Sequence, residues 1–162
     1  PNVRVLVEDE PMGTAGPLMI HKDELDEIFL IMNGDTWLSA DPRKMGFRDN
    51  SSSVAQIAVT SVDDAGRYGS VTSDSLGRIV DFVEKDPSGF NKPGFVNAGW
   101  CLARKKIIDQ IESLPCSLEQ DIFPKLVGKL SLESIELEGS FFDIGIPSTL
   151  EYARKNLDFY RK

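Results

Sequence analysis

Two aspartates, each at the end of an apolar run, are the residues of this sequence best suited to chemistry. Asp35 ends the stretch "IFLIMNGD" and Asp143 ends the stretch "SFFD". Asp35 follows a predicted central strand, at the edge where α/β sheets bind ligands. Two aromatic neighbours partly desolvate Asp143, whose charge then needs a cation or hydrogen bonds to compensate it. Because carboxylate oxygens are preferred ligands of hard cations, the pair predicts a divalent-ion site. Each aspartate alone is also consistent with an ordinary turn.

Three further stretches carry groups suited to a phosphorylated or hydroxylated ligand. The glycine turn at 13–16, "GTAG", lets a ligand approach backbone N–H groups, although it matches neither the Walker nor the dinucleotide pattern. Glu84 and Lys85 end the stretch "DFVEK", where the carboxylate can accept from hydroxyls and the ammonium can meet a phosphate. An exposed ion pair explains these two residues equally well. Asn97 lies in an apolar stretch, so its amide needs partners.

The overall composition limits the classes of partner. The 162 residues suit one domain, and no apolar run approaches the roughly 20 residues of a membrane helix. A net charge of −8 argues against a nucleic-acid polymer, but a divalent ion or backbone N–H groups still allow a small phosphorylated ligand. Cys101 and Cys116 lack metal-site spacing, which indicates reduced thiols and a cytoplasmic location.

The chemistry-bearing residues fall between alternating predicted strands and helices. Strands are predicted over 3–8, 28–32, 54–62 and 94–103, helices over 13–23, 104–114 and 148–160, and a hairpin turn at 75–77. This order predicts a parallel sheet with helices on its faces, hence an α/β protein. Residues 1–162 are expected to form one domain.

Capping signals refine the helix predictions. Asp41, followed by a proline, predicts a short helix with Asp41 as its N-cap. Ser148 and Glu151 form a capping box for the last helix. Ser117 can start another helix, whose length Pro124 is expected to limit.

Taken in order, these stretches resemble the sugar-1-phosphate nucleotidylyltransferase family. The matching stretches are "MGTAG", "IMNGDTWLSAD", "RYGSVTSDSLGRIVDFVEK", "GFVNAGWCLA", "SLEQDIFPKL" and "FFDIGIPSTLEYA". The last two look most like the mannose-1-phosphate and D-glycero-D-manno-heptose-1-phosphate guanylyltransferases. The resemblance implies a three-layer α/β/α, Rossmann-like nucleotide-diphospho-sugar transferase fold with a mostly parallel mixed sheet.

The resemblance also implies roles for individual residues. Asp35 and Asp143 match the aspartates that hold Mg²⁺, and Lys85 matches the lysine near the sugar phosphate. The residues implied in substrate binding are Gly13, Thr14, Ala15 and Gly16 beside the base, and Gly69, Glu84 and Asn97 at the sugar. The implied substrates are a nucleoside triphosphate and a sugar-1-phosphate, which react to give a nucleotide sugar and pyrophosphate.

One family feature has no counterpart in these 162 residues. The family opens with a strand and a glycine-rich loop carrying Gly-Thr-Arg and then a lysine, which clamp the triphosphate. We therefore expect a truncated chain, with catalysis by these residues in doubt and a homodimer covering the exposed sheet edge. The alternatives are a noncatalytic sugar-nucleotide-binding, regulatory or assembly domain of the same fold, and a glycosyltransferase of similar architecture.

Overall fold

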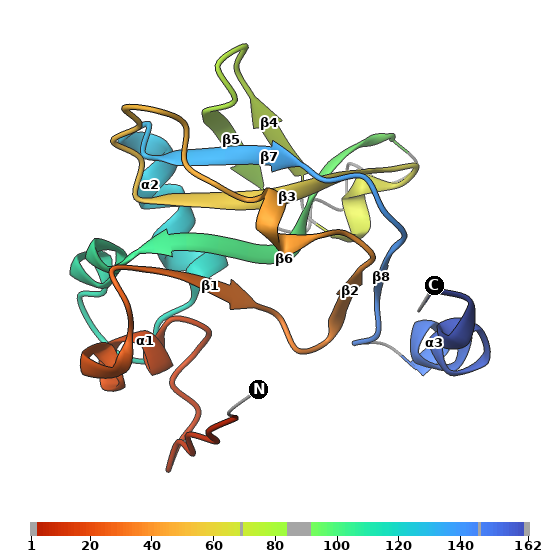
Figure 1. The fold of residues 1–162 in the computed structure, drawn as a ribbon, viewed down its shortest axis with the longest axis horizontal. Helices are drawn as coiled ribbons and strands as arrows, with labels where there is room; N and C mark the ends of the chain where they lie inside the picture. Colours follow the sequence, from red (N-terminus) through yellow and green to blue (C-terminus); the bar gives the residue numbers. More distant parts are fainter. Residues whose placement is uncertain (1–2, 69, 84–91, 146, 161–162) are drawn as a thin grey trace.

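The computed structural model describes residues 3–68, 70–83, 92–145 and 147–160, and Figure 1 shows how their elements are arranged. Six strands of these described residues form one mixed sheet, and two short strands form a second sheet beside it. The large sheet contains β1 (Ile28–Met32), β3 (Ala55–Val62), β4 (Ser70–Ser73), β5 (Ile79–Val83), β6 (Gly94–Arg104) and β7 (Leu132–Glu136). The small sheet pairs β2 (Thr36–Leu38) with β8 (Phe141–Asp143).

Strand β6 lies in the middle of the large sheet and pairs with three other strands. It pairs antiparallel with β3 along one edge, and with β4 and β1 along the other. Strand β3 continues the sheet through a parallel pairing with β7, and β5 pairs antiparallel with β4. The strands β1, β3, β4 and β7 therefore share one direction, and β5 and β6 run the other way. The expected mixed sheet is confirmed, although β6 makes most neighbouring pairs of the described strands antiparallel.

The core lies on both faces of β3 and β6. Residues 55–60 of β3 are all buried, and successive side chains of a strand point to opposite faces. Ile57 packs with Phe123 in one apolar cluster, and Ala58 packs with Trp100 and Leu38 in the other. Burial also raises the pKa of the Cys101 thiol to about 12, with the negative charge of Glu119 adding to the effect.

The helices are short except the last. They are α1 (Gly16–Ile20), α2 (Phe123–Gly128) and α3 (Pro147–Tyr160). Helix α2 lies against the sheet, where Phe123 meets Phe82 of β5 edge to face at 5.5 Å between ring centroids. Helix α3 lies at the side of the molecule beyond β8, with Tyr152 against Phe142 (Figure 1). None of the helices in the described ranges combines the length and apolar character that crossing a membrane requires.

Several sequence predictions hold in the structure. Helix α3 and the hairpin between β4 and β5 are confirmed. Asp41 caps the 3₁₀ turn Pro42–Lys44, since its Oδ1 accepts from the Arg43 backbone N at 2.9 Å. The Arg43 side chain also bonds this carboxylate, and together these hydrogen bonds lower the pKa of Asp41 to about 2.

Other predictions were wrong. Residues 3–8 form no strand; they are exposed and have no regular secondary structure. The helix expected over 13–23 shortens to α1 and the 3₁₀ turn Lys22–Glu24, because the chain before Gly16 is held to another segment. The helix expected over 104–114 is a 3₁₀ turn, Lys105–Gln110, since β6 continues through Arg104.

The positions of two prolines explain why two further helix predictions were wrong. Pro124 does not limit the helix after Ser117, because it occupies the first turn of α2, where a backbone N–H is not needed. A π turn, Leu118–Ile122, leads directly into that helix. Helix α3 begins at Pro147, so Ser148 lies inside its first turn and does not cap it.

A bulge in β6 brings the ends of several elements together. Ile57 pairs with Cys101 and Val59 with Asn97, so residues 98–100 of β6 face a single residue of β3. Gly99 lies in this bulge with φ of +79°, and its carbonyl accepts from the Asn33 N at 2.8 Å. A Cβ at this position would lie 3.0 Å from the Thr36 Cβ. The bulge thus fixes the turn that follows β1.

We expect the substitution Gly99→Ala to lower the free energy of unfolding by about 1–3 kcal/mol, because a side chain is strained at this φ and meets Thr36. Urea unfolding followed by circular dichroism measures the change. Gly46→Ala is the matched control, since an added Cβ there meets nothing within 4 Å. Equal stability of the two variants would contradict the role of the bulge.

Candidate functional site

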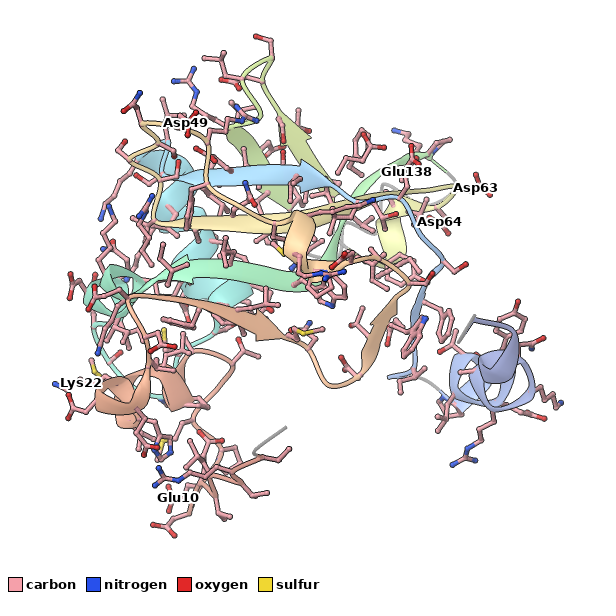
Figure 2. The ribbon with its side chains drawn as sticks, in the orientation of Figure 1. Glu10, Lys22, Asp49, Asp63, Asp64 and Glu138 are labelled. Atoms are coloured by element: carbon pink, nitrogen blue, oxygen red, sulfur yellow. The ribbon has the colours of Figure 1, made fainter. Side chains whose placement is uncertain are left out.

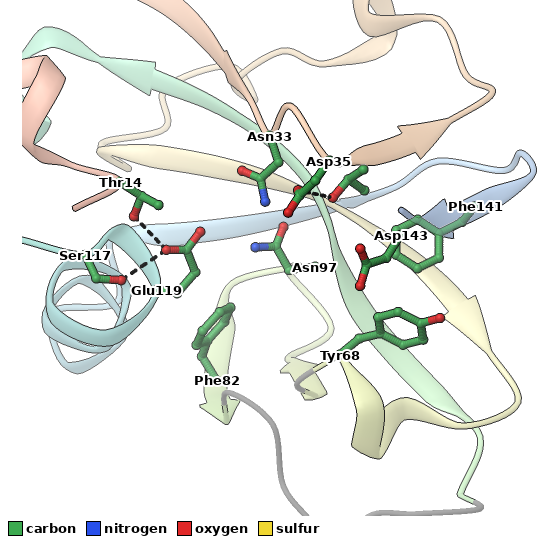
Figure 3. Close-up of a pocket in the computed structure, with 11 residues that line it drawn as sticks. Thr14, Asn33, Asp35, Tyr68, Phe82, Asn97, Ser117, Glu119, Phe141 and Asp143 are labelled. Atoms are coloured by element: carbon green, nitrogen blue, oxygen red, sulfur yellow. Dashed lines mark hydrogen bonds between the residues drawn. The ribbon is translucent and has the colours of Figure 1, made fainter. Parts of the chain in front are cut away.

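A pocket of about 330 Å³ opens beside the bulge of β6, at the carboxyl end of β1. Ligands of open α/β sheets bind at this kind of edge. Its lining residues come from seven separate parts of the chain and are shown in Figure 3. They are Thr14, Asn33, Asp35, Thr36, Tyr68, Phe82, Asn97, Ser117, Glu119, Phe141 and Asp143.

Two aspartates meet at one end of the pocket. Strand β2 pairs with β8 so that Thr36 faces Asp143, which places Asp35 beside Asp143. The Ile144 N donates to the Asp35 carbonyl at 2.7 Å and holds the two segments together. A Cβ added to Gly145 would lie 2.9 Å from the Asp143 Oδ1 and 3.4 Å from the Asp35 Oδ2. Both carboxylates therefore face the same small space.

These carboxylates have few partners. Thr36 Oγ1 donates to Asp35 Oδ1 at 3.3 Å, and the Gly145 N donates to Asp143 Oδ1. No ion pair to either aspartate and no group of three or more metal-ligating side chains occurs within the described ranges. Two oxygen donors fit Mg²⁺, which commonly takes one or two carboxylates and completes its shell with phosphate and water. They do not match the four-ligand set of a structural zinc site.

The glycine turn forms the opposite wall by joining the segment that leads into α2. The Ala15 N donates to the Cys116 carbonyl at 2.9 Å. Gly13 has φ of +76°, and an added Cβ would lie 2.3 Å from the same carbonyl oxygen. Only glycine permits this close approach of the two backbones. The approach places Thr14 in the pocket.

A hydrogen-bonded carboxylate lies at this wall. Thr14 Oγ1 accepts from the Leu118 N at 2.7 Å and donates to Glu119 Oε2 at 2.8 Å. Ser117 Oγ donates to the same oxygen at 3.1 Å. Figure 3 shows Glu119 between these hydroxyls and the interior of the pocket. The pocket therefore has acidic groups at both ends.

Asn97 lies between the two ends, and aromatic rings form other parts of the wall. Asn97 Oδ1 accepts from the Gly99 N at 3.0 Å, which leaves the Asn97 NH₂ group for the pocket. The ring of Phe82 forms part of the wall below Asn97 in Figure 3. Tyr68 and Phe141 meet edge to face at 5.3 Å between centroids and lie beside Asp143 in Figure 3. The pocket wall as a whole is suited to a ligand with both polar and apolar faces.

The structure brings together four of the residues that the sequence singled out: Asp35, Asp143, Thr14 and Asn97. Gly13, Ala15 and Gly16 form the turn behind Thr14 and do not line the pocket. Gly69, Glu84 and Lys85 lie outside the described residues.

Glu119 is a site residue that the sequence alone does not indicate. Its stretch "SLEQD" predicts a cap at Ser117, and this cap is present, since Ser117 Oγ accepts from the Gln120 N at 3.2 Å. The direction of Glu119 depends on the π turn after the cap, a feature that often occurs at functional sites. The residue spacing of an α-helix therefore does not predict that the Glu119 side chain points into the pocket.

The chain matches the family model described as "Nucleotidyl transferase" over residues 1–158. It therefore belongs to the nucleotidyl transferase family, which confirms the resemblance and the fold class.

Similar proteins extend this result. The chain is 37% identical over 163 residues to mannose-1-phosphate guanylyltransferase 1 of Arabidopsis thaliana, covering 96% of this chain and 44% of that protein. It is 36% identical over 146 residues to the mannose-1-phosphate guanylyltransferase catalytic subunit beta of Drosophila melanogaster, covering 86% and 38%. The chain thus spans less than half the length of these relatives.

A solved structure is similar over most of the chain. It is the crystal structure of HddC from Yersinia pseudotuberculosis complexed with GMP-PN, with a TM-score of 0.77 and 30% sequence identity. The match covers 94% of this chain and 65% of that one.

Proposed function

We propose that the protein carrying this chain transfers a nucleotidyl group from a nucleoside triphosphate to a sugar-1-phosphate, giving a nucleotide sugar and pyrophosphate. The observation that supports this most is the pair Asp35 and Asp143, held by two paired strands at one end of a pocket. The names of the relatives suggest mannose-1-phosphate and GTP as substrates, with GDP-mannose as product. A heptose-1-phosphate, giving GDP-heptose, is the other substrate that the sequence resemblance suggests.

In the proposed reaction, a phosphate oxygen of the sugar-1-phosphate attacks the α-phosphorus of the nucleotide. The bond between that phosphorus and the oxygen bridging to the β-phosphate breaks, and pyrophosphate leaves with the electron pair. Asp35 and Asp143 would hold Mg²⁺, which when bound neutralises phosphate charge. The chain's own work is then positioning and electrostatic stabilisation, with no covalent intermediate.

Asn97 and the residues outside the described ranges complete the proposal. The NH₂ group of Asn97 is placed to donate to a ligand in the middle of the pocket. Glu84 and Gly69 as sugar contacts, and Lys85 at the sugar phosphate, stay predictions from the sequence.

Activity tests the proposal. The protein in its natural full length, whether or not that exceeds these 162 residues, should form GDP-mannose and pyrophosphate from GTP and mannose-1-phosphate with Mg²⁺. Asp143→Asn should lower kcat by about 100-fold or more, because it removes charge that fixes the cation. Asp49→Asn is the matched control, since Asp49 lies at the outer edge of the molecule (Figure 2). Absence of product with every sugar-1-phosphate and nucleotide tried would overturn the proposal in favour of a noncatalytic domain.

Metal binding to the chain itself is a separate prediction. Without divalent ions, Asp35→Asn should raise the melting temperature slightly, because one of two like charges facing the same space is removed. Mg²⁺ at about ten times its Kd should stabilise the unmodified chain by about 1.4 kcal/mol and leave the variant unchanged. Differential scanning calorimetry measures both effects. Equal Mg²⁺ stabilisation of the two proteins would place the cation elsewhere.

We also propose a homodimer and a cytoplasmic location. The edge of β1 away from β6 has no strand partner in the described part of the chain, and Ile28 and Met32 there are 46% and 52% exposed. Unpaired strand edges favour pairing with a second copy. Two free, buried cysteines suit a reducing compartment.

Sedimentation equilibrium tests the homodimer. We expect a species of twice the 18.0 kDa chain mass at micromolar concentration. Ile28→Lys should shift it to monomer without unfolding it, because a charge then lies on the shared edge. A monomer at all concentrations, with normal circular dichroism, would contradict the homodimer.

A further inference from the structure

We propose that Glu119 binds a sugar hydroxyl in this pocket and helps to select the sugar. Thr14 and Ser117 act as positioning residues for its carboxylate. The inference rests on the proposed function, since it names how the sugar-1-phosphate would be recognised.

The two oxygens of Glu119 have different environments. Oε2 accepts from Thr14 Oγ1 at 2.8 Å and from Ser117 Oγ at 3.1 Å. Among the described residues, no donor bonds Oε1, and in Figure 3 this oxygen points away from the two hydroxyls. Because one oxygen is held and the other is left for a ligand, the carboxylate is preorganised to accept one further hydrogen bond.

The charge of Glu119 restricts the ligand. Glu119 forms no ion pair among the described residues. Burial raises the pKa of the nearby Cys101 thiol, and the negative charge of Glu119 raises it further. An ionised carboxylate only accepts hydrogen bonds, and it repels phosphate. Its partner must therefore be a donor, such as a hydroxyl.

The neighbours of Glu119 favour a sugar as this ligand. The Asn97 NH₂ group can donate to a hydroxyl oxygen, and Phe82 presents an aromatic surface to the pocket. A sugar has hydroxyls that both donate and accept, and apolar C–H faces between them. The volume of about 330 Å³ lies at the lower end of the range for ligand pockets. It suits one monosaccharide between the hydroxyl-binding end at Glu119 and the phosphate end at the aspartates.

The hydrogen bonds of Thr14 fix the position of Glu119. Thr14 Oγ1 accepts from the Leu118 N at 2.7 Å, so its own proton must point to Glu119. This threonine therefore joins the glycine turn to the π turn. Loss of its hydroxyl should loosen the carboxylate without removing it.

The test is steady-state kinetics of Glu119→Gln in the natural full-length protein. Mannose-1-phosphate is varied at saturating GTP in one series, and GTP is varied at saturating mannose-1-phosphate in the other. The glutamine carbonyl can still accept from Thr14 and Ser117, so the fold is kept, while the NH₂ group replaces the acceptor that faces the ligand. We expect KM for the sugar-1-phosphate to rise about 10- to 100-fold, as for loss of a charge-assisted hydrogen bond, and KM for GTP to change by less than about twofold.

Three further variants make the result specific. Thr14→Val should raise the KM for the sugar-1-phosphate by a smaller factor than Glu119→Gln does. Glu112→Gln should leave this KM unchanged, since the Glu112 side chain is 80% exposed in a surface ion pair with Lys125. Mono-deoxy sugar-1-phosphates then identify the hydroxyl. One of them should bind less well to the unmodified protein and show no further loss with Glu119→Ala, because the two changes remove the same contact.

Other outcomes would overturn the inference. A rise confined to KM for GTP would assign Glu119 to the nucleobase, and a fall in kcat alone would assign it to the phosphate end. Unchanged kinetics would make it a structural residue of the turn. If the unmodified protein forms no nucleotide sugar, the proposed function fails; if it does and Glu119→Gln is unaffected, only the role of Glu119 fails.

Discussion

The bulge of β6 at Gly99 is the constraint on which the pocket depends. The bulge interrupts the β3–β6 ladder between Ile57 and Val59, and a Cβ at Gly99 would lie 3.0 Å from the Thr36 Cβ. The bulge instead turns the Gly99 carbonyl to the Asn33 N and its N–H to the Asn97 side chain. One left-handed glycine thereby sets the start of the turn carrying Asp35 and the orientation of Asn97. Bulges beside functional sites commonly re-aim side chains in this way.

The acidic side chains at the two ends of the pocket differ in their hydrogen-bond partners. Asp35 and Asp143 face a common space with few hydrogen-bond donors, an arrangement that favours a cation. Glu119 instead has two hydroxyls on one oxygen, which stabilise its charge without a cation. A sugar-1-phosphate has the complementary pattern, with its charge at one end and hydroxyls at the other. This match connects the electrostatics of the described residues to the reaction proposed for the family.

The sequence predicted what depends on short-range pattern. The strand before Asp35 follows from an apolar run and the Asp41 cap from capping chemistry, and the structure has both. The antiparallel course of β6 and the shortening of α1 depend on contacts between distant segments, such as Ala15 with Cys116. The role of Glu119 also depends on such contacts, because a π turn aims its side chain at a threonine 105 positions away. A single sequence carries no direct signal for these pairings.

The proposed reaction depends on a divalent cation that Asp35 and Asp143 hold together. The most direct measurement is paramagnetic broadening of assigned amide signals in the ¹⁵N-labelled chain by substoichiometric Mn²⁺ with GTP present. We expect the signals of Asp35, Thr36, Asp143 and Gly145 to broaden first, while that of Asp49 stays sharp. Broadening that begins at Asp49 or another surface acid, with these four signals unchanged, would contradict it.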